Sequence, residues 1–201
     1  MSIRSMLVAL AALSVATPVA LCAQESEADF AGARKQLMAG QPRAAAQTLL
    51  MSSLHVRQQV GRCRTEDVGS RLMEAESQLE KLAAGVRAGT VTVKAMEKSL
   101  MEIDRVLAQH HLQLAATNMA HPRADDIPVV AQDIDRGVFH FERSITLNGG
   151  ALVAEQLTAV NDARALVKEI ETNRAIPKGA VAVVAALERM VVASATVSAA
   201  R

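Results

Sequence analysis

The chain has 201 residues and is close to neutral, with 22 basic and 21 acidic side chains. Near-neutrality leaves no basic stripe for a phosphate backbone, and a composition of three Phe with no Trp or Tyr leaves almost nothing on which bases can stack. Nucleic-acid binding is therefore disfavoured. The length favours one domain large enough to bury its own core without disulfides.

The first 23 residues have the pattern of a secretory signal peptide. Arg4 precedes an apolar run over Met6–Leu21, which is short for a membrane span of about 20 residues. We therefore predict that residues 24–201 form a single exported domain, periplasmic or secreted, with no membrane span after signal cleavage. The stretch VALC around Cys22 offers lipoprotein processing as the alternative.

Helical signals run through the rest of the chain. Ala, Leu, Glu, Gln, Arg and Met, all good helix formers, are abundant. Apolar residues recur at spacings of three and four from Val68 to Val86 and from Met96 to Leu114, which predicts one buried face on each helix. No stretch alternates as a strand does. In chain order the predicted helices span residues 26–39, 42–61, 65–87, 92–120, 125–146, 150–173 and 178–198.

Turn and cap residues mark the ends of these helices. The hydroxyl of Thr65 precedes two acids and is expected to cap a helix N-terminus, whereas Gly89 suits a helix end. Pro122 ends the long fourth helix, Asn148-Gly149-Gly150 forms a loop, and Pro177 opens the last helix. The sequence therefore predicts an all-α antiparallel bundle of six or seven helices.

Two short stretches resemble each other. MAGQPRA begins at Met38 and MAHPRA begins at Met119, and each opens a helix with one histidine. One interpretation is a duplicated helical hairpin unit with halves at 26–91 and 92–201; the other is the chance likeness of Ala-rich helices.

The stretch ARKQLMAGQPRAAAQTLL (Ala33–Leu50) is similar in its packing pattern to a tetratricopeptide hairpin. A wider likeness adds the leader and the closing helix pair QLTAVNDARALVKEIETNRAIPKGAVAVVAALERM (Gln156–Met190). With these, the chain resembles the YfdX family of exported, all-helical bacterial proteins. The resemblance implies a periplasmic helical protein tied to acid or antibiotic stress, without catalysis.

The histidines are the candidate binding residues. His110 lies on the apolar seam between Leu107 and Leu114, and His111 lies about 100° further round the helix. In an antiparallel bundle they could converge with His55 and His140, which occupy similar places in the two repeats. Converging neutral imidazoles would bind copper or zinc, or ligate haem. The alternative is that they are core residues bonded across helix interfaces. The candidate metal ligands are His110, His111, His140 and His55.

Other polar residues have structural interpretations. Asp125 or Asp126, beside His121, either holds a divalent cation or caps the next helix. Asp133 is expected on a solvated face. Cys63 lies between two arginines, which would lower the pKa of a thiol and make a crosslinked dimer feasible; the alternative is a tolerated cysteine at a helix end.

Motifs for catalysis are missing. The chain has no Glu-x-x-His pair, H-E-x-x-H, C-x-x-C-H, G-x-S-x-G, S-x-x-K or phosphate loop. We therefore predict a non-catalytic exported binding or stress-protection protein that engages a protein partner or a small apolar ligand. The alternative is a histidine-mediated metal- or haem-binding bundle. The apolar last helix also favours self-association.

Overall fold

The computed structural model describes residues 28–147 and 149–199, and within these ranges it holds seven α-helices, one 3-10 turn and no strand. The predicted all-α fold is thereby confirmed, whereas the predicted signal peptide and its VALC stretch lie outside the described residues. None of the described helices is long and apolar enough to span a membrane. In chain order the elements are α1 (Phe30–Met38), α2 (Pro42–Val60), α3 (Glu66–Ala88), α4 (Val93–Ala120), η2 (Ala124–Asp126), α5 (Ile127–Thr146), α6 (Ala154–Asn173) and α7 (Ala180–Ala199).

Helices α1, α5, α6 and α7 begin two to four residues later than the sequence predicts, and α5 and α6 show why. The helix expected at 150–173 begins at Ala154, because Val153 has extended backbone and its N–H is bonded instead to the side chain of Gln156, 3.0 Å away. The helix expected from 125 is preceded by the single turn of η2 and begins at Ile127. In both cases local polar bonding at the N-terminus sets the start, which apolar periodicity does not report.

The cap predicted for α3 was wrong. The Thr65 hydroxyl makes no bond to the first turn of α3 and donates to the Gln113 side chain, 3.1 Å away on α4. Thr92 is a true cap, because its hydroxyl accepts the Ala95 N–H at 3.2 Å at the start of α4.

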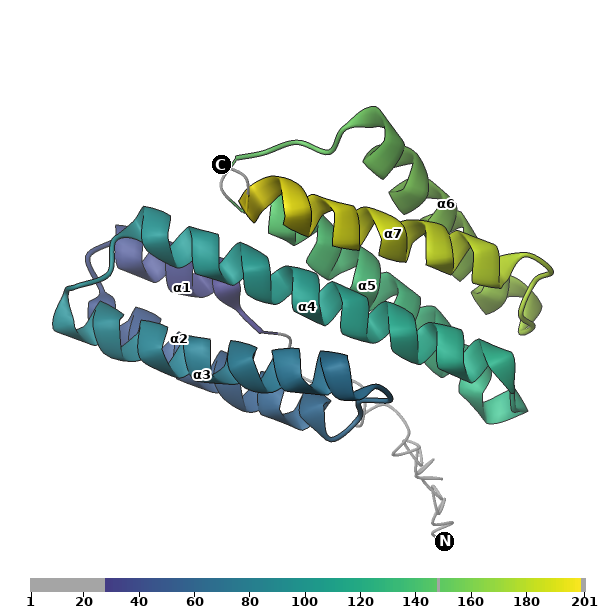
Figure 1. Cartoon of the computed structure of the whole chain (residues 1–201), viewed down its shortest axis with the longest axis horizontal. Coiled ribbons are helices and arrows are strands. Elements are labelled where there is room, and N and C mark those ends of the chain that lie inside the picture. The colour runs from purple at the N-terminus through teal and green to yellow at the C-terminus, as the bar shows by residue number, and fades with distance from the viewer. Residues whose placement is uncertain (1–27, 148, 200–201) are drawn as a thin grey trace, which may run out of the picture.

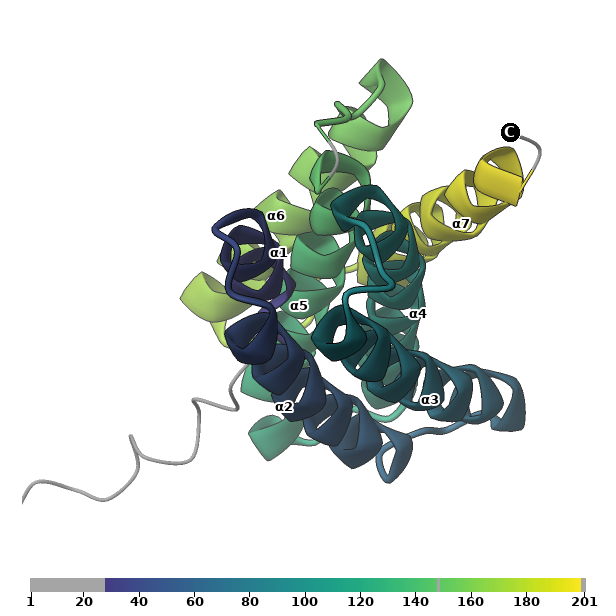
Figure 2. The same cartoon turned by 90° about the vertical axis from the view of Figure 1, so that its left-hand side faces the viewer.

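Helix α4 is the central element of the bundle (Figure 1). Helix α3, which pairs with α2, and helix α7 pack against α4, α5 folds back antiparallel to α4, and α6 packs against α5 and α7 (Figures 1 and 2). The hairpin of α4 and α5 therefore connects the N-terminal and C-terminal parts of the molecule.

The core consists of two hydrophobic clusters that share α4. The first is built from α1, α2, α3 and α4 as far as Leu107, and the second from α4 beyond Ala108 with α5, α6 and α7. The division falls in the middle of a helix, not at the 91/92 boundary between the predicted repeat halves, so the duplication stays a prediction. A layer of buried polar residues lies where the two clusters meet.

Helices α4 and α5 approach closely in this layer. A methyl group placed on Gly137 of α5 would lie 2.8 Å from the side chain of Leu112 and 3.5 Å from the carbonyl oxygen of Ala108, both on α4. The absence of a side chain at this position lets the two backbones come together. As a result, short side chains on one helix reach partners on the other.

Candidate functional site

The buried polar layer contains the four histidines that the sequence singled out. His55 comes from α2, His110 and His111 come from α4, and His140 comes from α5, and each is at most 6% exposed. The rings of His110 and His111 have centroids 5.2 Å apart, and those of His111 and His140 have centroids 5.7 Å apart with planes parallel to within 2°. The predicted convergence is therefore observed for these three rings.

Two aspartates bond to two of these histidines across the helix pair. Asp104 and His111 lie seven residues apart on α4, and Asp133 and His140 lie seven residues apart on α5. Because seven residues are about two helical turns, each Asp and His share one face of their helix. The helices run antiparallel, so His111 Nδ1 lies 3.0 Å from Asp133 Oδ1 and His140 Nδ1 lies 2.9 Å from Asp104 Oδ1.

These bonds fix the tautomer of both rings. A carboxylate only accepts, so Nδ1 of His111 and of His140 carries the proton and donates it. Each Nε2 is then a bare lone pair. Both Nε2 atoms are buried and have no hydrogen-bond partner among the described residues.

The carboxylates are held in place by arginines. Arg143 binds Asp104 through Nε and Nη2, with nitrogen–oxygen distances of 2.6 to 3.1 Å, and its guanidinium packs 4.5 Å from the ring centroid of Phe30. The same Nη2 lies 3.2 Å from His140 Nδ1. Both nitrogens carry protons, so they do not bond to each other, and each donates to the Asp104 carboxylate. On the other side, Arg62 Nη2 lies 3.7 Å from Asp133 Oδ1.

Burial keeps the histidines neutral. Burial, the largest cause, and the positive charges that neighbouring His111, Arg62, His140 and His55 can carry together lower the pKa of His110 to about 3. Burial also lowers the pKa of His111 and of His140, although the bonds to Asp133 and Asp104 oppose the shift. At neutral pH these side chains are therefore in the form that can act as lone-pair donors.

Asp133 was placed wrongly by the sequence analysis. It was expected on a solvated face, but it is 1% exposed and forms half of a buried pair. The signal that could have revealed both pairs is the repeated Asp-x6-His spacing, on α4 and again on α5. That spacing becomes informative only when the register of the helix hairpin is known.

Cys63 contacts the edge of this layer. Its Sγ lies 3.6 Å from His110 Nδ1, and His110 Nε2 lies 3.3 Å from the side-chain oxygen of Gln59. A thiol, an imidazole and an amide in series resemble the chemistry of a cysteine nucleophile. However, burial raises the pKa of Cys63, contrary to the lowering expected from its arginine neighbours, and the pKa of His110 is too low for it to take the thiol proton. Both shifts therefore oppose formation of a thiolate.

Other predicted ligands lie apart from the layer. His121 is exposed at the end of α4, and the carboxylate of Asp126 accepts the Arg123 N–H at 3.2 Å, so it acts as a cap. Within residues 28–147 and 149–199 no group of three or more His, Cys, Asp or Glu side chains is arranged to hold a metal ion. The four histidines thus share a layer without forming a multidentate cage.

The chain matches no protein-family model, no curated protein and no solved structure. The resemblance to the YfdX family therefore stays a prediction.

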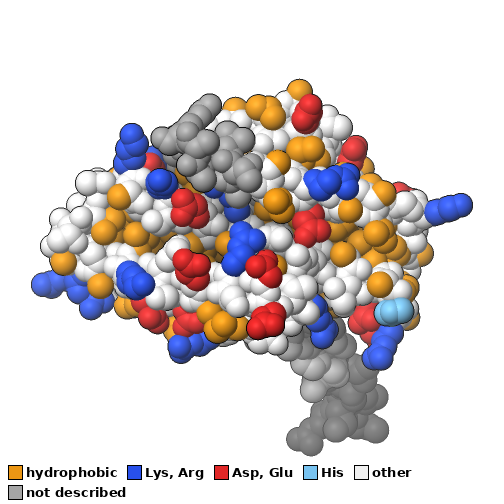
Figure 3. Space-filling view, viewed as in Figure 1, with side chains coloured by type: hydrophobic (Ala, Val, Ile, Leu, Met, Phe, Trp, Pro, Cys, Tyr) orange, Lys and Arg blue, Asp and Glu red, His pale blue; other side chains and the backbone are white. Residues whose placement is uncertain are grey.

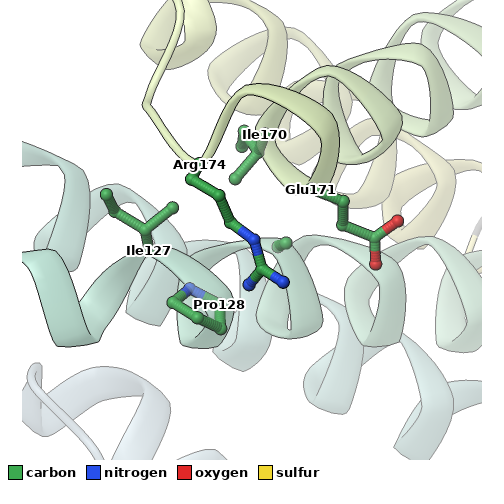
Figure 4. A pocket seen from close by; sticks show the side chains of 6 residues that line it. Ile127, Pro128, Ile170, Glu171 and Arg174 are labelled. Carbon is green, nitrogen blue, oxygen red and sulfur yellow. The ribbon is translucent and has the colours of Figure 1, made fainter.

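A second site lies between α5 and α6 and was not predicted. It is a pocket of about 210 Å³, with an apolar wall from α5 and both charged and apolar side chains from α6 (Figure 4). Its lining residues are Ile127, Pro128, Ala131, Ile170, Glu171 and Arg174.

Arg174 is the distinctive residue of this pocket. It ends α6 with φ of 50°, and it is the one non-glycine residue with positive φ in the described part of the chain. Its side chain extends from the end of α6 toward Pro128, while the Glu171 carboxylate lies to one side (Figure 4). Neither charge forms an ion pair with another described residue. Such backbone strain is often found at binding sites.

Proposed function

We propose that this chain is an exported, non-catalytic helical binding protein of the stress-protection kind, whose ligand is a small apolar molecule with one negative charge. The observation that carries the proposal is the pocket between α5 and α6, where the unpaired guanidinium of Arg174 faces an apolar wall. The resemblance to exported YfdX-like proteins and the absence of a catalytic motif in the sequence support it.

The size and lining of the pocket define the ligand class. At about 210 Å³ the pocket lies below the range of roughly 300–1,000 Å³ that is usual for drug-sized ligands, so it suits one aromatic ring or a short acyl chain. Ile127, Pro128 and Ile170 offer apolar contact, and Arg174 offers a charge-assisted hydrogen bond to a carboxylate. The carboxylate of Glu171 would repel a second negative charge.

Benzoate tests this proposal. Titration of the mature chain followed by amide NMR should move resonances of α5 around Ile127 and of α6 around Ile170, and benzyl alcohol, its neutral counterpart, should bind more weakly. We expect Arg174→Gln to weaken benzoate binding about tenfold, which corresponds to about 1.4 kcal/mol. Arg164→Gln, an exposed arginine of α6 that already pairs with Glu142, is the matched control.

Two results would refute the pocket assignment. One is equal affinity for benzoate and benzyl alcohol, which would show that the guanidinium has no part in binding. The other is a set of benzoate-induced shifts that stays unchanged in the Arg174 variant.

A protein partner is the other occupant that the sequence predicts. Val153 and Leu157 of the α6 region and Val181 and Val192 of α7 are each at least 46% exposed. On the face shown in Figure 3, however, apolar side chains are interleaved with charged ones. Scattered exposed apolar residues are normal for a protein surface, so this face favours the small ligand over a large apolar interface.

Metal or haem binding by the histidines is the alternative function. The specific observation in its favour is the pair of bare, buried Nε2 atoms of His111 and His140. Because helices pack around them on all sides, the arrangement favours a single ion over a porphyrin, which needs an open slot beside the ligating nitrogen.

A further inference from the structure

We infer that Nε2 of His111 and Nε2 of His140 form a two-coordinate site for a monovalent soft cation, Cu(I) or Ag(I). This inference deepens the metal-binding alternative and names its ligands. It shares no residue with the pocket between α5 and α6, so either can fail without the other.

The two imidazoles are prepared as ligands by the carboxylates behind them. In metal sites, a ligating histidine commonly donates its other ring N–H to a carboxylate, which fixes the tautomer and raises the basicity of the ligating nitrogen. His111 with Asp133 and His140 with Asp104 both have this arrangement, at 3.0 and 2.9 Å. The rings are 1% and 0% exposed, and each bare Nε2 lacks a partner among the described residues.

The spacing of the rings suits one bridging ion. A metal–imidazole bond is about 2.0 Å long, so two nitrogens that share one ion lie about 4 Å apart when the bonds are collinear. The rings of His111 and His140 are parallel to within 2° and their centroids lie 5.7 Å apart, a separation that leaves room for one ion between them.

The number of ligands selects the kind of ion. Zn²⁺ takes four ligands and Ca²⁺ or Mg²⁺ takes six or more, chiefly oxygens. No group of three or more suitable side chains is available within the described ranges. Cu(I) and Ag(I) are closed-shell ions that are commonly satisfied by two collinear donors, and imidazole is among the ligands of copper.

The charge balance of the layer also favours a monovalent ion. Asp104 and Asp133 supply two negative charges, which the guanidiniums of Arg143, at 2.6 Å, and Arg62, at 3.7 Å, already offset. Desolvating an ion in a protein interior is costly, and the cost grows with its charge. One further positive charge is therefore better tolerated here than two.

A third soft donor, the thiol of Cys63, lies near the two rings. Cys63 is half-buried at the edge of the layer, with Sγ 3.6 Å from His110 Nδ1, and the ring of His110 is in turn 5.2 Å from that of His111.

The test uses Ag(I) as an air-stable probe in chloride-free buffer, on mature Cys63→Ser protein so that no thiol competes. We expect one equivalent of Ag(I) per chain. Nitrogen-15 NMR of the histidine rings should show that Nε2 changes on addition of Ag(I) in two of the five rings, those of His111 and His140. Because this measurement needs no histidine variant, it stands even if such variants fold poorly.

Variants then assign the ligands. His111→Gln and His140→Gln should each weaken Ag(I) binding at least 100-fold. The positioning variant Asp133→Asn should weaken it 10- to 100-fold, as is usual when the partner of a ligating histidine is removed. His121→Gln, at the exposed histidine that follows α4, is the matched control and should leave the affinity for Ag(I) unchanged.

Two outcomes would overturn the inference. One is a Cys63→Ser protein that binds no Ag(I), which would mean that the two Nε2 atoms are met only by water. The other is Ag(I) bound with ring-nitrogen changes confined to His121 or His55, which would place the ion elsewhere.

Discussion

Because its histidines are buried and neutral, we expect the metal-free protein to lose stability in mild acid. His110 has a pKa of about 3 in the folded chain and an ordinary value of about 6.5 in the unfolded chain. Above pH 6.5 both states hold the ring neutral, and the shift has no effect on folding. As the pH falls below 6.5 the unfolded chain takes up a proton that the folded chain excludes, so unfolding becomes more favourable until the pH approaches 3.

The magnitude follows from the size of this window. One proton bound only by the unfolded state costs about 1.4 kcal/mol of unfolding free energy per pH unit, so His110 alone should remove about 2 kcal/mol between pH 7.5 and pH 5.0. Lowered pKa values of His111 and His140 act in the same direction. Against a typical total of about 5–15 kcal/mol, this is a large fraction of the stability.

Urea denaturation followed by far-ultraviolet circular dichroism, in EDTA at pH values from 7.5 to 5.0, measures the effect. This range avoids most carboxylate titration in the unfolded chain. In His110→Gln the unfolding free energy should fall by about 2 kcal/mol less than in the parent between pH 7.5 and pH 5.0, and the difference in slope should approach about 1.4 kcal/mol per pH unit near pH 5. Comparing slopes removes any uniform loss of stability caused by the substitution, and exposed His121→Gln supplies the control. A slope that is zero in the parent chain, or the same in both chains, would refute the reasoning.

Four substitutions test the packing by urea denaturation. Gly137→Ala should lower the unfolding free energy by about 1–3 kcal/mol, because the new methyl group would lie 2.8 Å from an α4 side chain. Gly61→Ala is the control: with φ of −64° and its nearest neighbour at 3.6 Å, it should raise the unfolding free energy by about 0.4–1 kcal/mol. Equal effects of the two substitutions would contradict the close approach of α4 and α5. Asp104→Asn should cost about 3–5 kcal/mol, since it leaves a largely buried guanidinium without its carboxylate, and a loss below 1 kcal/mol would show that the pair is solvated. Arg174→Gly should stabilise the chain by about 1 kcal/mol by relieving the left-handed backbone while it weakens benzoate binding; a destabilised variant would show that the arginine makes a structural contact.

The helices and their buried faces were predictable from local order. The seams from Val68 to Val86 and from Met96 to Leu114 correspond to buried faces of α3 and α4, because burial of an amphipathic helix demands apolar residues every three or four positions. Helix starts were less predictable, as α6 shows, because a single side-chain bond at Gln156 sets the first turn.

The candidate site was likewise predictable only in part. The sequence predicted that His110 faces another helix, since it lies on an apolar seam, and it left open whether His111 and His140 join it. The sequence could not show which ring nitrogen of each histidine donates to a carboxylate, because Asp104 and Asp133 reach their partners only in the register that the close contact at Gly137 allows.

The sequence by itself thus determined which segments are helical and that His110 faces a neighbouring helix, because both follow from spacing within a few turns of one helix. The tertiary structure alone decided the crossed Asp–His pairs, the two bare Nε2 atoms and the pocket at Arg174. These depend on distances between helices, and such distances are set by how side chains far apart in the chain pack together.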